Sequence, residues 1–219
     1  MITFKNQDLL LQALTHRSYL NENPAFGLGH NERLEFLGDA VLELIVTEKL
    51  YAEFPDKPEG ELTSFRAALV NSNMLSEMAT EIGVNDFLLL SRGEAKDVGR
   101  ARQYILANAF EAIIGAIYLD HGYAICAEFI HRVLMPKMQD VLSKKLYKDP
   151  KSLFQEEAQE RTGITPSYEV LREWGPDHDK HFVIGVYLEK ELIAEGEGPS
   201  KQIAQEEAAR LALHEKGWL

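Results

Sequence analysis

The chain has 219 residues, of which 45% are hydrophobic and 26% charged, a composition typical of one or two globular domains. This composition excludes intrinsic disorder and collagen-like repeats, and a single cysteine, Cys126, excludes an intrachain disulfide. The first 148 residues hold 15 basic and 20 acidic side chains, the remainder holds 8 and 15, and the net charge is −12. Neither part therefore has the overall basic charge typical of a nucleic-acid-binding protein.

The most apolar segment, residues 104–119, is interrupted by Asn108 and Glu111. It is also shorter than the roughly 20 apolar residues that a membrane-spanning helix needs, so we expect no membrane span. The first residues lack the basic and apolar regions of a secretory signal. We therefore expect a cytoplasmic protein.

Residues 9–142 show apolar side chains at three- and four-residue spacings, which predicts an all-α domain. The segment 144–150 contains charges, a proline and little periodicity, as linkers do. We place the first domain at residues 1–145, the linker at 146–150 and a second domain at 151–219.

The second domain has a different pattern, which predicts a small α+β fold in the order α-β-β-β-α. The predicted elements are a helix at 151–161, strands at 167–173, 181–188 and 191–196, and a closing helix at 200–216.

Acidic residues recur every three or four positions along the helix predicted to begin near residue 32. They are Glu32, Glu35, Asp39 and Glu43. Side chains at this spacing share one face of a helix and lie about 5–6 Å apart, so their like charges repel. A solvated helix face would explain them, and so would a site that binds a cation.

A second helix, predicted over residues 103–119, is apolar on almost every side and is therefore expected to be buried. Its central turns contain two polar side chains, Asn108 and Glu111, and no Lys or Arg to pair with them. A buried carboxylate without a partner is costly. Asn108 and Glu111 are therefore either a hydrogen-bonded pair in the core or part of a functional site.

Oxygen ligands on two helices, with few bases near them, suggest a site for a hard divalent cation such as Mg²⁺. Such an ion can activate water and stabilise charge on a phosphodiester. A di-iron bundle is a further alternative, because Glu128 and His131 fit a Glu-x-x-His motif. Di-iron sites need that motif twice, and the sequence contains it once.

Several segments in a fixed order resemble ribonuclease III over essentially the whole chain. Residues 31–42, Asn-Glu-Arg-Leu-Glu-Phe-Leu-Gly-Asp-Ala-Val-Leu, look like the signature segment of that family. Segments 13–19, 59–63 and 106–116 are also similar to it, and segments 175–182 and 196–201 resemble contact regions of a double-stranded-RNA-binding domain.

The resemblance implies an all-α nuclease domain followed by a small α+β RNA-binding domain. It further implies a Mg²⁺-dependent endonuclease, in which Mn²⁺ can substitute, that cuts double-stranded RNA in RNA processing. The products would have 5′-phosphate and 3′-hydroxyl ends with short 3′ overhangs. The implied metal-site residues are Glu35, Asp39, Asn108 and Glu111, of which Asp39 and Glu111 are catalytic, with Glu32 and Glu59 in support.

The resemblance also implies a homodimer with one cleavage centre per strand. Phe36 falls where the family packs its dimer contact. An ordinary core position is an equally acceptable interpretation of this residue.

Asn108 departs from the family, which usually has Asp at this position. An amide oxygen can still bind a hard cation, but one negative charge is missing. We favour retained cleavage, because Glu111, one turn later, is intact. The alternative is a catalytically weakened protein that binds double-stranded RNA.

The second domain is expected to recognise the shape of an RNA duplex through hydroxyl, amide and basic side chains. By resemblance, the RNA-binding residues are Ser152, Gln155, Glu156, Gln159, His178, Ser200 and Lys201. Gln202 stands where the family usually has another base, so we expect weak binding by a single domain. Dimerisation would couple two such domains on one duplex.

Overall fold

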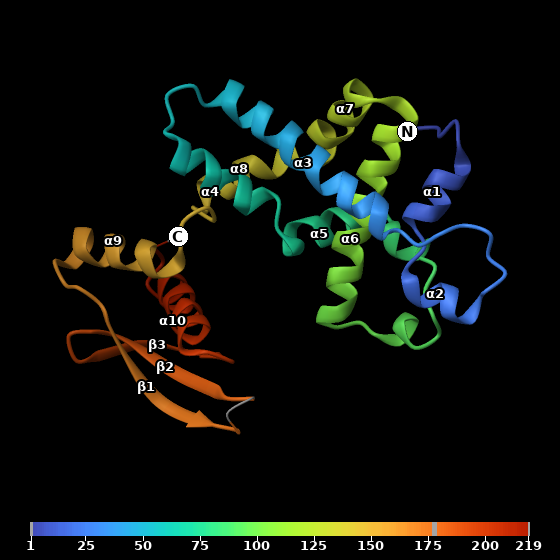
Figure 1. The fold of residues 1–219 in the computed structure, drawn as a ribbon. Helices are drawn as coiled ribbons and strands as arrows, with labels where there is room; N and C mark the ends of the chain where they lie inside the picture. Colours follow the sequence, from blue (N-terminus) through green and yellow to red (C-terminus); the bar gives the residue numbers. More distant parts are fainter. Residues whose placement is uncertain (1, 177–178, 219) are drawn as a thin grey trace. The chain divides into compact units, whose positions relative to one another are not determined.

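The computed structural model describes residues 2–176 and 179–218 (Figure 1). It divides into two compact units, one ending at Leu142 and the other beginning at Ser143. Residues 146–150, the predicted linker, thus fall in the second unit, and the domain limits themselves stay predictions. No helix within the described residues has both the length and the hydropathy that a membrane span requires.

The first unit is built of helices, as the sequence predicts. Its elements are α1 (Gln7–Ala13), α2 (Arg17–Glu22), α3 (Glu32–Glu53), α4 (Glu59–Leu69), α5 (Ser72–Glu81), the 3-10 helices η1 (Val84–Asp86) and η2 (Glu94–Lys96), α6 (Arg100–His121), α7 (Tyr123–Val133), η3 (Met135–Lys137) and α8 (Met138–Ser143). The last helix, α8, continues one residue past the boundary between the units.

Two helices of 22 residues each, α3 and α6, form the centre of this unit (Figure 1). Leu42 and Ile45 of α3 and Phe110 and Ile114 of α6 are fully buried. Burial of α6 confirms what its sequence predicts, although the helix is longer than expected at both ends. Its first turn uses residues 100–102, which precede the predicted start of the helix.

Two glycines allow α3 and α6 to touch through their backbones. A Cβ atom on Gly38 would lie 1.8 Å from the backbone carbonyl oxygen of Glu111, and one on Gly115 would lie 2.2 Å from that of Leu34. Any larger residue would push the helices apart. Because Gly38 meets Glu111 while Leu34 meets Gly115, the two helices run antiparallel, and the contact brings the neighbour of Gly38, Asp39, next to the turn that carries Glu111.

The second unit confirms the predicted α-β-β-β-α order. Its elements are α9 (Pro150–Thr162), β1 (Ser167–Trp174), β2 (His181–Leu188), β3 (Glu191–Gly198) and α10 (Lys201–Glu215). The strands form an antiparallel sheet in the order β1-β2-β3, in which Val186 lies opposite Tyr168 on one side and Ala194 on the other.

Both helices of the second unit pack on the same face of the sheet (Figure 1). Phe154 of α9, Val186 of β2 and Ala208 of α10 share one hydrophobic core. Gly196 lets α10 approach β3, because a Cβ there would lie 2.1 Å from the backbone nitrogen of Ala208. Within the described part of this unit, the opposite face of the sheet carries no helix.

Among the described residues of this unit, Glu157 is the acidic residue that is buried, and its charge is paired. Its carboxylate accepts hydrogen bonds from the Lys145 ammonium and from Arg161 Nε, the latter at 2.7 Å. These hydrogen bonds lower the pKa of Glu157 below its usual value.

Candidate active site

The acidic residues of α3 lie on successive turns of its exposed side. Glu32, Asp39 and Glu43 are exposed, and Glu35 is half-buried. Glu32 at one end lies 3.5 Å from Arg17 and 3.8 Å from His30. The ends of the stripe are thus balanced by cations, since Glu43 at the other end lies 3.7 Å from Arg66.

The centre of the stripe has no such balance. Among the described residues, no basic side chain forms an ion pair with Glu35, Asp39 or Glu111. Burial, followed by the charges of Asp39 and Glu35, raises the pKa of Glu111 to about 7. Burial and the charges of Glu32 and Asp39 likewise raise the pKa of Glu35. Carboxylates of α3 and α6 therefore lie close enough to repel one another.

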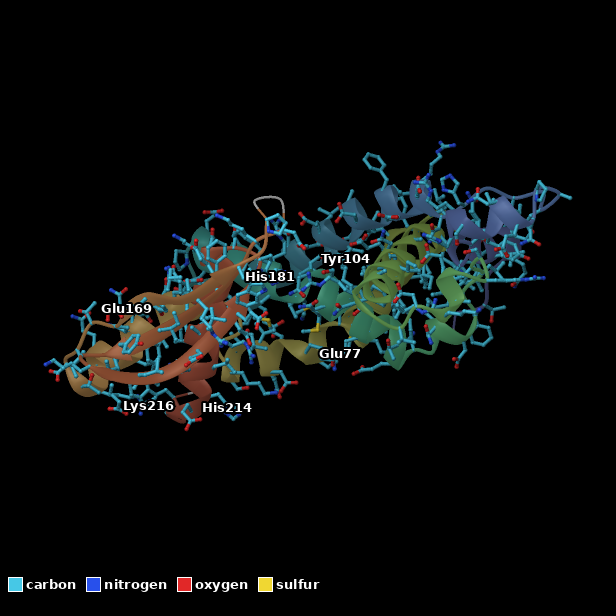
Figure 2. The ribbon with its side chains drawn as sticks, turned by 90° about the horizontal axis from the view of Figure 1, so that it is seen from below. Glu77, Tyr104, Glu169, His181, His214 and Lys216 are labelled. Atoms are coloured by element: carbon cyan, nitrogen blue, oxygen red, sulfur yellow. The ribbon has the colours of Figure 1, made fainter. Side chains whose placement is uncertain are left out.

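Asn108 lies one turn before Glu111 on the same side of α6. Its side chain is half-buried and makes no hydrogen bond within the part of the chain that the structure describes. The interpretation of Asn108 and Glu111 as a hydrogen-bonded core pair is therefore not supported. Tyr104, one turn earlier, is 52% exposed (Figure 2).

The donors at this centre are the oxygens of Glu35, Asp39, Asn108 and Glu111, the atoms that Mg²⁺ prefers. In the described residues, no three Asp, Glu, His or Cys side chains are already arranged as a metal-binding set. Mg²⁺ commonly keeps several waters and uses only one or two carboxylates together with substrate phosphates. The residues thus fit the ion by their chemistry and mutual repulsion, without a closed cage of protein ligands.

Within the described part of one chain, Glu59 is not among the charges that raise the pKa of Glu35 or Glu111. It lies in the first turn of α4, where its carboxylate accepts a hydrogen bond of 2.9 Å from the Thr63 hydroxyl. It lines a separate cavity with Thr47 and Tyr51.

Phe36 is 83% exposed, so the interpretation of this residue as an ordinary core position is wrong. The α3 helix turns it outward, on the surface next to a cavity of about 630 Å³. Leu9, Leu34, Leu37 and Leu119 also line that cavity. An aromatic ring exposed to this degree on an apolar surface is typical of a contact with another protein chain.

The predicted RNA-binding residues of α9 share one exposed face of that helix. They are Ser152, Gln155, Glu156 and Gln159. The opposite face of the helix carries the core residues Leu153 and Phe154. Glu156 also accepts a hydrogen bond from Lys148.

Ser200 and Lys201 lie together at the start of α10. The Ser200 hydroxyl accepts a hydrogen bond of 3.2 Å from the Ile203 backbone and so caps the helix. Lys201 is exposed, and its ammonium lies 5.7 Å from the centre of the Phe182 ring. Gln202 is also exposed and donates to Glu206. The predicted RNA-binding residue His178 lies outside the described residues.

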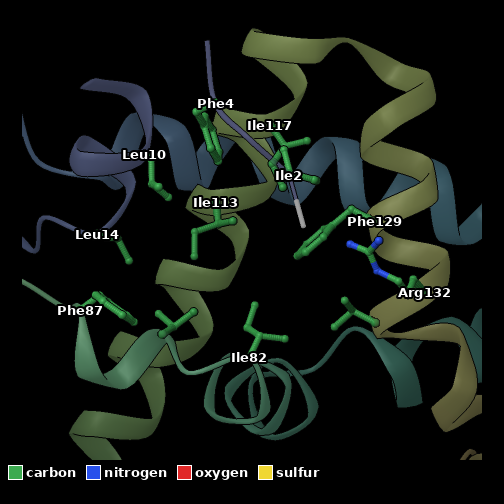
Figure 3. Close-up of a pocket in the computed structure, with 12 residues that line it drawn as sticks. Ile2, Phe4, Leu10, Leu14, Ile82, Phe87, Ile113, Ile117, Phe129 and Arg132 are labelled. Atoms are coloured by element: carbon green, nitrogen blue, oxygen red, sulfur yellow. The ribbon is translucent and has the colours of Figure 1, made fainter. Parts of the chain in front are cut away.

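Two other places lack the required chemistry. A cavity of about 460 Å³ lies on the opposite side of α6, lined by apolar side chains such as Ile113 and Ile117 and by Arg132, without a carboxylate (Figure 3). Glu128 and His131 are exposed on α7, so they do not form the inward-facing pair of a di-iron bundle.

Sequence reasoning missed Gly38 and Gly115, the residues that join the two halves of the site. A glycine inside a helix costs about 1 kcal/mol relative to alanine. Two such glycines, one beside Asp39 and one a turn after Glu111, were the available signal of a close helix contact.

Two family models match this chain. Residues 6–138 match the model described as ribonuclease-III-like, and residues 150–216 match the double-stranded RNA binding motif. The two matches fall on the helical unit and on the α-β-β-β-α unit, respectively.

Relatives and solved structures agree with these matches. The chain is 46% identical to ribonuclease 3 of Desulforamulus reducens, over 95% of this chain and 85% of that one, and 45% identical to ribonuclease 3 of Borreliella afzelii, over 97% and 86%. Its structure is similar to the nuclease domain of ribonuclease III from Campylobacter jejuni, with a TM-score of 0.56 and 41% identity, over 61% of this chain and 90% of that one. The chain belongs to the ribonuclease III family and is an endoribonuclease of that type, with a nuclease domain followed by a double-stranded-RNA-binding motif.

Proposed function

We propose that this protein cuts double-stranded RNA with the help of Mg²⁺, leaving 5′-phosphate and 3′-hydroxyl ends with short 3′ overhangs. The observation that carries the proposal is the position of Glu111. It faces Asp39 and Glu35 across the contact of α3 and α6, without a basic partner among the described residues. Carboxylates in mutual repulsion at a surface favour the binding of a cation.

Glu35, Asp39 and Glu111 would hold the metal through carboxylate oxygens, and Asn108 would contribute its amide oxygen. A bound Mg²⁺ lowers the pKa of water and stabilises the charge that develops on the phosphate, and Mn²⁺ can take its place. The side chains of this site fix where the scissile phosphate comes to lie. Glu32, which lies near Arg17, supports the site from the adjacent turn.

In the reaction, a water oxygen bonds to the phosphorus and the bond from phosphorus to the 3′ oxygen breaks. The water loses a proton, and the leaving 3′ oxygen gains one. These changes produce the 5′-phosphate and the 3′-hydroxyl. The rigid contact between α3 and α6 holds Asp39 and Glu111 in place throughout, and such positioning accounts for much of the catalysis of phosphate chemistry.

We further propose that the protein acts as a homodimer, with Phe36 of each chain in the contact. The exposed ring and the leucines that line the cavity beside it support this assignment. Glu59, which lines a separate cavity of its own chain, would then be able to support the site from another position in the dimer. Sedimentation velocity tests the dimer, and Phe36→Ser should shift the protein towards the mass of a single chain.

The RNA-binding surface would consist of the exposed face of α9, His178 and the start of α10 with Ser200 and Lys201. A helix N-terminus attracts phosphate through its free N–H groups and its dipole. Lys201 adds a positive charge there. We propose that the protein uses this surface on cytoplasmic RNA precursors, in RNA processing.

Incubation of the purified protein with a long RNA duplex and Mg²⁺ tests the proposal. Short duplex products with 5′-phosphate ends are expected, and no products without a divalent cation. A shifted but intact duplex at every Mg²⁺ and Mn²⁺ concentration would contradict the proposal and favour a protein that only binds RNA.

Asn108→Asp separates the role of Asn108 from the rest of the site. The added charge should lower the Mg²⁺ concentration needed for half-maximal cleavage, because hard cations respond to the charge of their ligands. Titration of cleavage with Mg²⁺ measures this. An unchanged requirement would show that position 108 is not a functional ligand.

A further inference from the structure

Near the site, the side chains of α6 that are not buried form one narrow stripe. Between residues 104 and 117, every side chain of this helix is buried except three, Tyr104, Asn108 and Glu111. Spacings of four and three residues place these three on one side of the helix. Tyr104 therefore lies about 10 Å from Glu111 along the helix axis, on the same side of α6.

Tyr104 lies in the continuation of the carboxylate centre. Since α3 runs antiparallel to α6, the residues that follow Gly38 on α3 lie towards the Tyr104 end of α6. Within the described residues, the Tyr104 hydroxyl has no hydrogen bond and its ring makes no aromatic contact. Its neighbour Gln103, by contrast, is fixed by a hydrogen bond of 2.8 Å to Asn73 on α5.

The chemistry of a tyrosine suits this position. Its phenol is uncharged, so it can stand beside acidic residues without forming an ion pair with them. The hydroxyl both donates and accepts a hydrogen bond. The 2′-hydroxyl of RNA does the same, and proteins recognise RNA duplexes largely through 2′-hydroxyl and phosphate contacts in the shallow minor groove.

We propose that Tyr104 is a positioning residue that hydrogen-bonds a ribose 2′-hydroxyl of the cleaved strand, close to the scissile phosphate. The proposal rests on the proposed cleavage of RNA at the Glu111 centre. Tyr104 holds the strand in register with the carboxylates and adds a preference for RNA over DNA at one nucleotide.

A double-mutant cycle between protein and substrate tests this contact. The protein variants are wild type and Tyr104→Phe, and Tyr51→Phe on α3 is the matched control, because Tyr51 is also exposed, at 75%. The substrates are an RNA duplex with a mapped cut and copies with one 2′-deoxynucleotide at each position around that cut. Single-turnover cleavage rates are measured for every combination.

Tyr104→Phe should lower the rate about 3- to 10-fold, as expected for the loss of one hydrogen bond, and Tyr51→Phe should leave it unchanged. In the wild type, a 2′-deoxynucleotide at one position should lower the cleavage rate by the same factor as Tyr104→Phe. In Tyr104→Phe, that substitution should cause no further loss of rate. Independent losses at every position, or an unchanged rate in Tyr104→Phe, would overturn the assignment. A changed oligomeric mass of Tyr104→Phe would also overturn it, because the side chain would then belong to a contact between subunits.

The same double-mutant cycle can be measured through binding affinity instead of cleavage. With Ca²⁺ in place of Mg²⁺, the affinities of the same duplexes for the same variants should show the same coupling. Failure of the wild type to cut RNA would therefore count against the proposed function alone. Cleavage without coupling between Tyr104 and a 2′-hydroxyl would count against the Tyr104 contact alone.

Discussion

Each unit of this protein carries a glutamate at least half-buried on a helix, and the two units treat its charge in opposite ways. Glu157 of α9 is bound by Lys145 and Arg161, and its pKa is lowered. Glu111 of α6 meets Asp39 and Glu35 instead, and its pKa is raised to about 7. The first arrangement stabilises its unit, and the second destabilises it. Pairing, rather than burial, thus distinguishes the two carboxylates.

The contact that creates the Glu111 environment should be the most sensitive part of the nuclease unit. Gly38→Ala places a Cβ atom 1.8 Å from the Glu111 carbonyl oxygen, so the helices must separate. We expect a loss of about 3 kcal/mol or more in the stability of this unit, and loss of cleavage. The change is measured by circular dichroism during thermal unfolding.

Both tryptophans, Trp174 and Trp218, lie in the second unit, so their fluorescence reports on that unit alone. The unfolding transition that this fluorescence reports should be unchanged in Gly38→Ala. Gly60→Ala on α4 is the control, since no atom lies within 4 Å of the added Cβ. Equal melting temperatures of Gly38→Ala and the wild type would show that the close contact of α3 and α6 does not stabilise the nuclease unit.

Glu157→Gln should destabilise the second unit by about 1–3 kcal/mol, because Lys145 and Arg161 lose a carboxylate that is almost wholly buried. Because the folded pKa is lowered, the stabilisation exists above the unfolded value of 4.5 and is lost as the pH falls through the folded pKa. Urea unfolding followed by tryptophan fluorescence at several pH values measures both effects. The variant should lose this acid sensitivity.

Glu156→Gln is the matched control, because it removes the neighbouring carboxylate from an exposed pair with Lys148. It should have the smaller effect. If the two variants lose equal stability in urea, pairing of the buried charge does not stabilise the second unit.

Glu111→Gln should change stability in the opposite direction to Glu157→Gln, because it should stabilise the nuclease unit. The variant should also lose cleavage and keep RNA binding. The raised pKa means that ionisation of Glu111 costs stability as the pH rises above 4.5, and the cost is complete above about 7. We expect a gain of about 1–3 kcal/mol at neutral pH with chelator present. Thermal unfolding, a cleavage assay and a gel-shift assay measure the three properties.

Glu77→Gln is the control for this sign, because Glu77 is exposed and pairs with Lys137 at 2.7 Å. Its removal should leave stability nearly unchanged or lower it slightly. A Glu111→Gln variant that is less stable than the wild type would show that Glu111 is a structural residue like Glu157.

Gln202→Lys should have the smallest effect and concerns the surface of the second unit. One more cation beside Lys201 should strengthen duplex binding at low salt and make the slope of log affinity against log salt steeper by about one. Fluorescence anisotropy across a salt series measures this slope, and Gln202→Glu should change it in the opposite direction. Equal slopes in the three proteins would place residue 202 away from the phosphates.

Local patterns predicted most of the fold. The change from helical spacing to strand alternation marks the second unit, and the middle strand occupies residues 181–188, as predicted. Differences are confined to element ends. The third strand continues to Gly198 because pairing with Phe182 extends it, and no alternation of apolar side chains marks that extension.

The site was less accessible to sequence reasoning. Spacing predicted that Glu35 and Asp39 share a face and that Glu111 stands in an apolar helix. Which turns of the two helices meet depends on Gly38 and Gly115, and contacts between distant segments leave no periodic signal. The direction in which Phe36 points likewise depends on which side of α3 the rest of the unit covers.

The meeting of Gly38 with the Glu111 turn also joins segments that a ribosome makes at different times. A ribosome makes Glu35 and Asp39 early, but the helix that completes the centre follows only after several further helices have been translated. A chain whose synthesis stops before α6 therefore lacks both Glu111 and the contact between α3 and α6.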